Sequence, residues 1–307
     1  MKSKIVVTGG AGFIGSHIVE ALAKEENEVV VIDNLRTGNV AKLNDINHKF
    51  INGDIRDLDC LISAFKNADT VFHLAAALSV PESMEKPVEY NDINGNGTLN
   101  VIKAAQECGV RRIVFSSSAA IYGDNPELPK VETMTPEPLS PYAVNKIDGE
   151  YYLNLFKSDT LSAVVLRYFN VFGPRQDPDS AYAAAVPIFI HRAIKGQEIN
   201  IYGDGQQTRD FVFVKDIVGA NLHARTAPAG VYNVGNNSST IIQTLAEKII
   251  SLTKSKSKLI NVPERPGEVK HSRASIEKII STGWQPSFPF DEALVKTTEY
   301  YKKDFLS

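Results

Sequence analysis

Three glycines spaced three residues apart near the N-terminus constrain the fold more than any other feature of the sequence. Gly9, Gly12 and Gly15 follow the apolar run Ile5–Val7, and residues 17–23 then carry apolar side chains at helical spacing. This order predicts a buried parallel strand, a tight turn and a helix. Glycine lets the backbone approach a pyrophosphate at the positive end of such a helix. The spacing is one residue longer than in the Gly-x-Gly-x-x-Gly form, so a glycine-rich turn without a ligand is the alternative interpretation.

An acidic residue follows the second apolar run, where a dinucleotide-binding unit carries one. The run Glu28–Ile32 predicts another buried strand, and Asp33 comes directly after it, 18 residues beyond Gly15. That spacing suits a carboxylate that binds the ribose hydroxyls of an adenosine. The carboxylate would repel a 2′-phosphate, so the sequence favours NAD over NADP, although Arg36 nearby weakens this inference. The alternative is that Asp33 is a solvated turn acid.

Strands and helices alternate through the first half of the chain. Further strands are predicted at 49–52, 70–74, 112–116 and 162–168, and helices at 57–66, 87–108 and 141–156. Such alternation predicts an α/β fold with a Rossmann-type, doubly wound parallel sheet. Ligands of these sheets bind beyond the carboxyl ends of the strands. Residues with suitable chemistry fall at that edge: Gly9, Asp33, Asp54, Ala75 and Ser118.

The alternation lapses near residue 171, which predicts a second, smaller unit. We expect residues 1–169 to form the NAD-binding domain and residues 170–307 to form a smaller mixed α/β lobe that binds the substrate. A strand near 211–214 is a candidate to rejoin the first domain. The five prolines between residues 123 and 141 predict a loop that passes over the site.

Charge, hydropathy and cysteine content exclude several classes of protein. The net charge of −3 argues against a nucleic-acid surface, and no apolar run approaches the ~20 residues of a membrane span. Cys60 and Cys108 lie in no Cys-x-x-Cys or His/Cys cluster, so neither a disulfide nor a metal site is expected. The first strand follows so closely on Met1 that no signal peptide is expected. We therefore expect a cytoplasmic protein without nucleic-acid or membrane partners.

Tyr142 and Lys146 lie four residues apart in a segment predicted to be helical, which places both side chains on one face. A lysine ammonium beside a phenol favours the phenolate, so we expect Lys146 to lower the pKa of Tyr142 from about 10. Such a tyrosine can remove a proton from a hydroxyl near neutral pH. Ser118, 24 residues upstream, is a candidate hydrogen-bonding partner. Tyr-x3-Lys alone is a common pattern, and its weight here comes from Ser118 and the glycine turn.

Together these residues give the chain a resemblance to the extended short-chain dehydrogenases/reductases, and more closely to the NAD-dependent UDP-sugar 4-epimerases. The resemblance covers nearly the whole chain. It rests on these segments, in the family's order: Thr8–Gly15, Asp33-Asn34, Asp54-Ile55, His73–Ala76, Asn94-x-x-Gly97, Ser116–Ser118, Tyr142-x3-Lys146, Arg167–Asn170, Ile201–Asp210 and Arg265–Glu268. It implies a transient oxidation at C4′ of the sugar, with Ser118, Tyr142 and Lys146 as the catalytic residues.

The resemblance also implies which residues bind the cofactor and the substrate. NAD would contact Gly9, Gly12, Phe13, Ile14, Gly15, Asp33, Asn34, Asp54, Ile55, Leu74, Ala75, Ala76, Asn94, Tyr142, Lys146 and Phe169. The UDP-sugar would contact Ser79, Ser118, Tyr142, Asn170, Val186, Tyr202, Arg209, Arg265, Glu268 and Ser272. Arg209 and Arg265 would clamp the diphosphate. Glu268 would hold the uridine ribose, where many relatives carry aspartate. No metal ligand is implied.

The two residues after Ser118 bear on the type of reaction. They are Ala119 and Ala120, whereas sugar dehydratases and decarboxylases of the same fold carry acidic residues there. Alanine cannot transfer protons, so simple epimerisation is favoured over these alternatives. A non-catalytic NAD-binding scaffold is the main alternative from another class, but the set of serine, tyrosine and lysine is complete.

Ser272 bears on the sugar. The resemblance places a bulky tyrosine there in members restricted to UDP-glucose and UDP-galactose, and a small residue where a 2′-acetamido group must fit. Segments 128–132 and 176–184 also resemble members that use N-acetylhexosamines. We therefore expect UDP-N-acetylglucosamine and UDP-N-acetylgalactosamine as substrates, with UDP-glucose and UDP-galactose as the alternative. The helices at 87–108 and 141–156 resemble those of a four-helix-bundle dimer interface, so a homodimer is expected.

Overall fold

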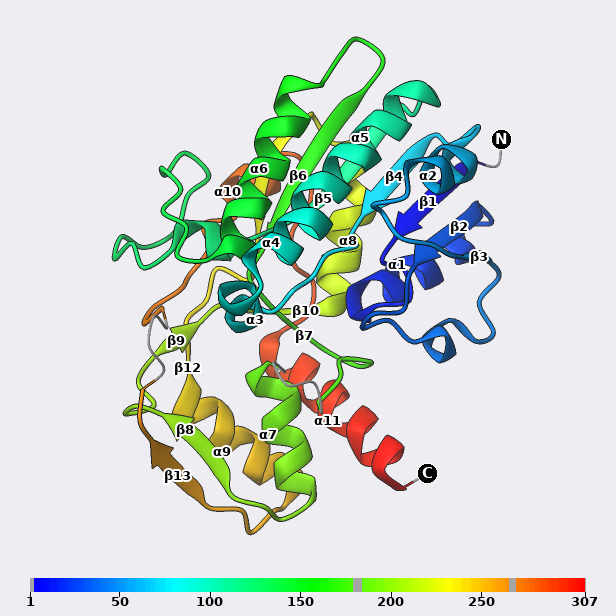
Figure 1. Cartoon of the computed structure of the whole chain (residues 1–307). Helices are drawn as coiled ribbons and strands as arrows, with labels where there is room; N and C mark the ends of the chain where they lie inside the picture. Colours follow the sequence, from blue (N-terminus) through cyan, green and yellow to red (C-terminus); the bar gives the residue numbers. More distant parts are fainter. Residues whose placement is uncertain (1–2, 179–183, 265–268, 307) are drawn as a thin grey trace.

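The structure is a computed structural model that describes residues 3–178, 184–264 and 269–306. Within these residues the chain forms a large α/β domain and a smaller lobe beside it, into which the C-terminal helix packs (Figure 1).

A seven-stranded parallel sheet forms the centre of the large domain. Its strands, in spatial order, are β11 (Gly230–Val234), β6 (Ser162–Tyr168), β5 (Arg112–Ser118), β4 (Thr70–His73), β1 (Lys4–Thr8), β2 (Glu28–Asp33) and β3 (Lys49–Asn52). All neighbours pair in parallel, as expected of apolar runs that are buried on both faces. The predicted Rossmann-type fold is confirmed. The strand order reverses between β1 and β4, which is where such sheets bind ligands.

Helices cover both faces of the sheet because successive strand residues point to opposite sides. In β1, Ile5 and Val7 belong to one core cluster and Val6 belongs to another. The first cluster is covered by α1 (Phe13–Lys24), α8 (Val214–Ala224) and α10 (Glu277–Ile280). The second is covered by α2 (Leu58–Phe65), α5 (Gly97–Glu107) and α6 (Pro141–Leu155). Figure 1 shows α5 and α6 side by side over this second face.

The segment predicted as one helix at 87–108 is built from three pieces. After α3 (Val80–Glu85), α4 (Pro87–Tyr90) continues through a π-helical segment, η2 (Asn91–Asn96), into α5. Segments of π-helix are rare and frequently lie at functional sites. The widened turn here buries Asn94, which is 3% exposed. Short 3₁₀ turns also follow β2 and β5, at η1 (Val40–Leu43) and η3 (Ala119–Tyr122).

The smaller lobe has its own core, and short two-stranded sheets lie beside it. β8 (Ile199–Tyr202) pairs in parallel with β13 (Leu259–Val262), and β9 (Thr208–Arg209) pairs antiparallel with β12 (Thr240–Ile241). The core is closed by α7 (Ala185–Ile194), α9 (Ile242–Thr253) and α11 (Phe290–Leu306). The mixed α/β character predicted for this part is confirmed.

The strand predicted near 211–214 does not rejoin the large sheet. β10 (Phe211–Phe213) pairs with β7 (Asn170–Phe172) in a separate two-stranded sheet, and β11 is the strand that returns. The reason is packing, because both phenylalanines of β10 belong to the core of the smaller lobe and lie against Phe172. The chain crosses back into the large domain through α8.

None of the helices within the described ranges combines the length and the apolar character needed to cross a membrane.

Candidate active site

The glycine turn after β1 is packed too tightly for a larger residue. Gly9 has a φ of +72°, and a Cβ built on it would lie 2.7 Å from the backbone nitrogen of Ala75. A Cβ on Gly15 would lie 2.2 Å from the carbonyl oxygen of Gly9. Gly12 is the N-cap of α1, and the first N–H groups of a helix have no intrahelical acceptor. The turn therefore suits a pyrophosphate.

Asp33 ends β2 beside this turn and is only 8% exposed. One carboxylate oxygen accepts from the backbone nitrogen of Ala11 at 3.0 Å, and the other accepts from that of Leu35 at 2.8 Å. Burial raises the pKa of Asp33 above its ordinary value, and ribose hydroxyls would add donors to this carboxylate. One cavity of about 80 Å³ brings together the predicted cofactor residues Gly9, Gly12, Asp33, Asn34, Asp54, Ile55, Leu74, Ala75 and Ala76.

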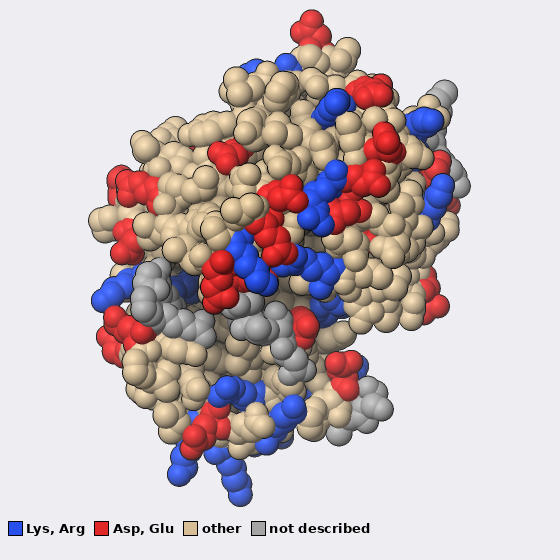
Figure 2. Space-filling view, in the orientation of Figure 1, with Lys and Arg blue, Asp and Glu red and all other residues tan. Residues whose placement is uncertain are grey.

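Arg36, which had weakened the inference of NAD over NADP, is held by carboxylates. Its guanidinium pairs with Glu89 and, at 3.2 Å, with Glu82. Further along the same cavity, Asn34 donates to Asp54 at 2.8 Å. Arg36 still lines the cofactor cavity, but its charge is balanced there by Glu82 of α3 and Glu89 of α4. The acidic residue after β2 therefore still favours NAD. Figure 2 shows that, on one face of the molecule, side chains of Lys and Arg lie next to side chains of Asp and Glu.

The Asn94 side chain supports the loop after β4 by hydrogen bonds to the backbone of that loop. The side-chain oxygen accepts from the nitrogen of Ala77 at 2.8 Å, and the side-chain nitrogen donates to the oxygen of Ala77 at 3.0 Å. The two bonds clamp the residue that follows Leu74, Ala75 and Ala76. Asn94 thus acts on the cofactor cavity by positioning its wall.

The helix α6 places Tyr142 and Lys146 on one face, as predicted. Ser140 caps the helix and Pro141 occupies its first turn. Tyr142 is 9% exposed and Lys146 is 3% exposed. The Lys146 Nζ lies 5.8 Å from the centroid of the Tyr142 ring and donates to the carbonyl oxygen of Ser116 at 2.8 Å.

The pKa of Tyr142 is shifted in the direction opposite to the one predicted. Burial raises the pKa of this phenol, and a hydrogen bond with Ser118 offsets only part of the effect. Burial also lowers the pKa of Lys146 to about 8, which the Glu150 carboxylate opposes. The expectation that Lys146 makes Tyr142 acidic is therefore wrong for these groups by themselves, because both are desolvated.

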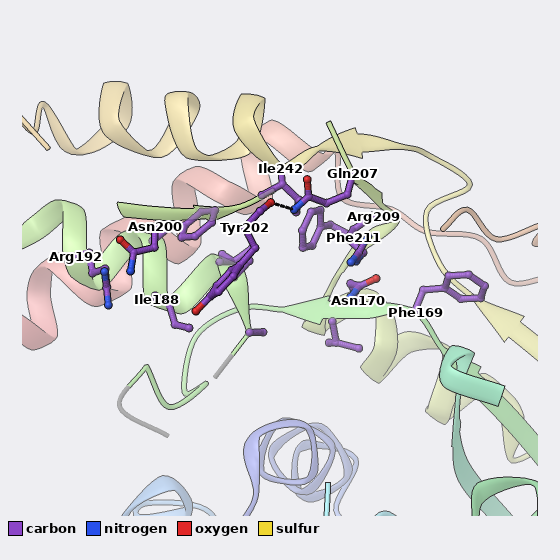
Figure 3. A pocket seen from close by; sticks show the side chains of 15 residues that line it. Phe169, Asn170, Ile188, Arg192, Asn200, Tyr202, Gln207, Arg209, Phe211 and Ile242 are labelled. Carbon is purple, nitrogen blue, oxygen red and sulfur yellow. Dashed lines mark hydrogen bonds between the residues drawn. The ribbon is translucent and has the colours of Figure 1, made fainter. Parts of the chain in front are cut away.

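Two cavities meet beyond the carboxyl ends of the strands. The larger, about 550 Å³, lies in the smaller lobe, and the other, about 240 Å³, lies over the end of β5. Both are lined by Phe169, Asn170 and Arg209. Figure 3 shows Asn170 and Arg209 close together, with Tyr202 further along the larger cavity. The two cavities thus form one elongated site with a polar centre.

The smaller cavity has Ser118 and Ser272 in its wall. Ala119 and Ala120 also line it, and no Asp or Glu does among the residues that the structure describes. Tyr142 is not in the lining but lies behind it, joined to Ser118. The larger cavity contains the predicted substrate residues Val186 and Tyr202.

Three of the residues predicted to contact the substrate are not found in the wall of either substrate cavity among the described residues. Arg265 and Glu268 lie outside the described residues, as does the stretch 179–183 of the segment 176–184. Ser79 caps α3, where its hydroxyl accepts from the backbone nitrogen of Glu82 at 3.0 Å, and it lines neither of the two substrate cavities. Its contact with substrate stays a prediction.

The cavities also contain residues that sequence reasoning missed. Asn200 lies two residues before Tyr202 on β8, and both line the larger cavity. Strand alternation was the signal that could have found Asn200. Arg192 comes from α7 and lines the same cavity, and no motif marks it. Lys130, from the proline-rich loop, borders the smaller cavity.

Comparisons with known proteins agree with this geometry. A model of the "NAD dependent epimerase/dehydratase family" matches residues 5–235. A UDP-glucose 4-epimerase of Mycolicibacterium smegmatis is 36% identical over 97% of this chain and 98% of its own. A solved UDP-N-acetylglucosamine 4-epimerase of Methanobrevibacter ruminantium, in complex with UDP-N-acetylmuramic acid, is 42% identical, with a TM-score of 0.95 over 99% of this chain and 100% of its own. The UDP-glucose 4-epimerase of Thermus thermophilus, in complex with NAD, is 37% identical, with a TM-score of 0.91 over 97% and 99%.

The chain therefore belongs to the NAD dependent epimerase/dehydratase family. Its resemblance to the UDP-sugar 4-epimerases among the extended short-chain dehydrogenases/reductases is confirmed, and the protein is an NAD-dependent isomerase. The described residues fit NAD, because the glycine cradle leaves no room for a Cβ and Asp33 closes the ribose end.

Proposed function

We propose that the protein catalyses the reversible epimerisation of a UDP-hexose at C4′, and that its main substrates are UDP-N-acetylglucosamine and UDP-N-acetylgalactosamine. One observation carries the proposal. Ser118 and Ser272 line a single cavity of about 240 Å³, which meets the larger cavity at Asn170 and Arg209. A nucleotide in the larger cavity would place its diphosphate at Arg209 and its sugar against Ser118.

The cofactor would lie along the carboxyl edge of the sheet. The turn from Gly9 to Gly15 would hold its pyrophosphate, Asp33 its adenosine ribose, and the loop clamped by Asn94 its nicotinamide end. Lys146 would bind the nicotinamide ribose. When bound, NAD supplies the hydride acceptor and donor for C4′.

The protein's own residues would remove and return the proton of the 4′-hydroxyl. Tyr142 would take that proton, and Ser118, already hydrogen-bonded to the phenol, would hold the same oxygen in place. Lys146 would carry positive charge beneath the ring, 5.8 Å from its centroid. After the 4-keto sugar turns over in the cavity, Tyr142 would return the proton. Catalysis by positioned proton transfer of this kind contributes about 10²–10⁴-fold in rate.

The nucleotide part of the substrate would be held by the smaller lobe. Arg209 lines both cavities, and its fork of donors suits a diphosphate. Asn170 would bind the same group from β7. Tyr202 and Val186 would contact the uridine. Arg265 and Glu268 keep their predicted roles as a second clamp and a ribose ligand.

The size of residue 272 favours the acetylated sugars. A serine in the wall leaves space that a tyrosine would fill, and the relative from Methanobrevibacter ruminantium, described as a UDP-N-acetylglucosamine 4-epimerase, supports this choice. The relatives described as UDP-glucose 4-epimerases support UDP-glucose and UDP-galactose as the alternative. Dehydration or decarboxylation is disfavoured because Ala119 and Ala120 stand where an acid would be needed.

Separate incubations with UDP-N-acetylglucosamine and UDP-glucose in the presence of NAD test the proposal, with the sugars resolved by proton NMR. We expect the axial 4′ epimer to form faster from the acetylated substrate. Formation only from UDP-glucose would keep the reaction and remove the role of Ser272. A 4-keto-6-deoxy product, or no epimer from either sugar, would overturn the proposal.

We also propose a homodimer that forms through α5 and α6. Val144, Tyr151 and Leu155 recur on α6 at spacings of seven and four residues and are 41%, 56% and 71% exposed. An apolar stripe at this spacing is typical of a helix that packs against another. Two copies joined there would bring their α5–α6 pairs together as a four-helix bundle.

A further inference from the structure

We propose that Glu150 and Arg167 form a positioning unit that holds the catalytic serine, tyrosine and lysine in register. The inference rests on the proposed function for its kinetic readout. It concerns residues outside the cofactor and substrate contacts described above.

The pair is a buried ion pair with several hydrogen bonds. The Arg167 Nη2 donates to Glu150 Oε2 at 2.7 Å, and its Nε donates to Glu150 Oε1 at 3.0 Å. Both side chains are only 6% exposed. Such a two-bond contact fixes the orientation of both groups. Apolar residues of similar volume often hold a fold equally well, so a buried ion pair is weak evidence for stability as such. We infer a positioning role because the pair joins the end of β5 to the helix α6.

On the strand side, the pair holds the end of β5. The Ser117 hydroxyl donates to Glu150, and both groups are buried. Ser117 lies opposite Arg167 in the pairing of β5 with β6. Ser118, the residue that hydrogen-bonds Tyr142, comes next in the chain. The Glu150 carboxylate therefore fixes the backbone from which Ser118 projects.

On the helix side, the pair holds the turn that carries Lys146. Tyr142, Lys146 and Glu150 follow at intervals of four residues on α6, so they share one face. The groups around the Lys146 ammonium include the Ser116 carbonyl, the rings of Phe115 and Tyr142 and, on β4, His73. Burial keeps His73 uncharged, with its pKa lowered to about 3. Glu150 is thus the carboxylate that favours the charged form of Lys146.

The network continues to the wall of the sugar cavity. The Arg167 Nη1 donates to the Tyr122 hydroxyl at 2.9 Å, which donates to Asn233 at 2.6 Å. The Asn233 side-chain nitrogen donates to the backbone oxygen of Lys130 at 2.9 Å. Both Tyr122 and Lys130 line the smaller cavity, and the backbone of Lys130 accepts from that of Ser275 at 2.8 Å, three residues beyond Ser272. One network thus connects the catalytic residues with the segment predicted to select the sugar.

A Ser117→Ala variant removes one link and leaves the ion pair in place. We expect kcat to fall about tenfold, less than the roughly hundredfold that a misplacement of about 1 Å can cost, with KM within about twofold of the wild-type value. Thr297→Val is the matched control, because Thr297 is also fully buried and its hydroxyl donates to the backbone oxygen of Ala293 at 2.7 Å in α11. We expect this control to lose comparable thermal stability and to keep the wild-type kcat.

A Glu150→Gln variant removes the carboxylate that favours a charged Lys146. We expect the pKa of Lys146 to fall by about one unit, read from the Cε shift of labelled lysine and assigned with Lys146→Met. The basic limb of the kcat profile should move down by a similar amount. The double variant Glu150→Gln/Arg167→Met avoids an unpaired buried guanidinium. It should show the same lower pKa and a low kcat even if the single variant does not fold.

The inference is overturned if Ser117→Ala and a folded variant without Glu150 both keep wild-type kcat and an unmoved pH profile. Failure of the proposed function gives a different result, namely a wild-type protein that epimerises neither sugar. In that case the Lys146 pKa still tests the link to Glu150, and a Lys146 pKa unchanged by Glu150→Gln overturns it.

Discussion

Replacing Gly9 by alanine separates the packing role of this glycine from its backbone conformation. Gly9 has a φ of +72° and Gly109 has a φ of +68°, so alanine costs about 1–2 kcal/mol of conformational strain at either position. The surroundings differ. A Cβ on Gly9 would lie 2.7 Å from the nitrogen and 2.9 Å from the Cα of Ala75, whereas a Cβ on Gly109 would meet nothing within 4 Å.

The atoms that a Cβ on Gly9 would meet are backbone atoms and cannot rotate away. Overpacking of this kind costs about 1–3 kcal/mol more. We expect the free energy of unfolding of Gly109→Ala to fall only by the cost of conformational strain, with NAD affinity unchanged. We expect that of Gly9→Ala to fall by the cost of strain and the cost of overpacking together. This variant should also bind NAD about ten- to a hundredfold more weakly, because the displaced loop at Ala75 lines the cofactor cavity.

Urea unfolding and calorimetric titration with NAD measure the two effects on purified variants. Gly109→Ala measures the cost of conformational strain alone, and Gly9→Ala measures that cost together with the cost of the close contact with Ala75. An equal loss of stability in both variants, with wild-type NAD affinity in Gly9→Ala, would refute the argument that the close approach to Ala75 shapes the cofactor site.

Four further outcomes follow from the site and the packing. We expect Tyr142→Phe to lower kcat about a hundredfold or more while bound NAD is retained; near wild-type turnover would remove Tyr142 as the base. We expect Ser272→Tyr to reduce kcat/KM about ten- to a hundredfold for UDP-N-acetylglucosamine only, through a steric cost of about 1–3 kcal/mol; an equal loss for UDP-glucose would contradict its role in selection. His17 is buried with its pKa lowered to about 4, so the stability from its neutral form is complete above pH 6.5 and is lost as the pH falls toward 4. By linkage this loss of stability is about 3 kcal/mol. In urea unfolding, the free energy of unfolding of His17→Asn should fall less steeply with decreasing pH than that of wild type; parallel declines would contradict the role of His17. We expect Leu155→Lys to elute as a monomer in light-scattering chromatography, and an unchanged dimer would exclude α6 from the interface.

The sheet and the cofactor cradle were predictable because their signals are local. The segment 162–168 is largely apolar and 49–52 has the apolar pair Phe50-Ile51 at its centre, and the structure has strands with the same bounds. Glycines at a fixed spacing after such a run allow few other conformations. The positions of Asp33 and Ser118 at one sheet edge then follow from the parallel topology.

The features that sequence reasoning missed depend on distant contacts. Arg36 is paired by carboxylates 46 and 53 positions away, which no local pattern indicates. The runs at 211–213 and 230–234 are both short and rich in apolar residues, and only tertiary packing decides that the second joins the large sheet. The pKa of Tyr142 was misjudged because the spacing to Lys146 shows a neighbour but not the depth of burial.

The fate of a deuterium at C4′ tests the central claim most directly. The protein would be incubated with UDP-N-acetylglucosamine deuterated at C4′, and the products would be analysed by NMR and mass spectrometry. A transient oxidation within one closed site should give UDP-N-acetylgalactosamine with the deuterium retained at C4′. Loss of deuterium to solvent, its appearance at C6′, or the absence of the axial epimer would contradict the account.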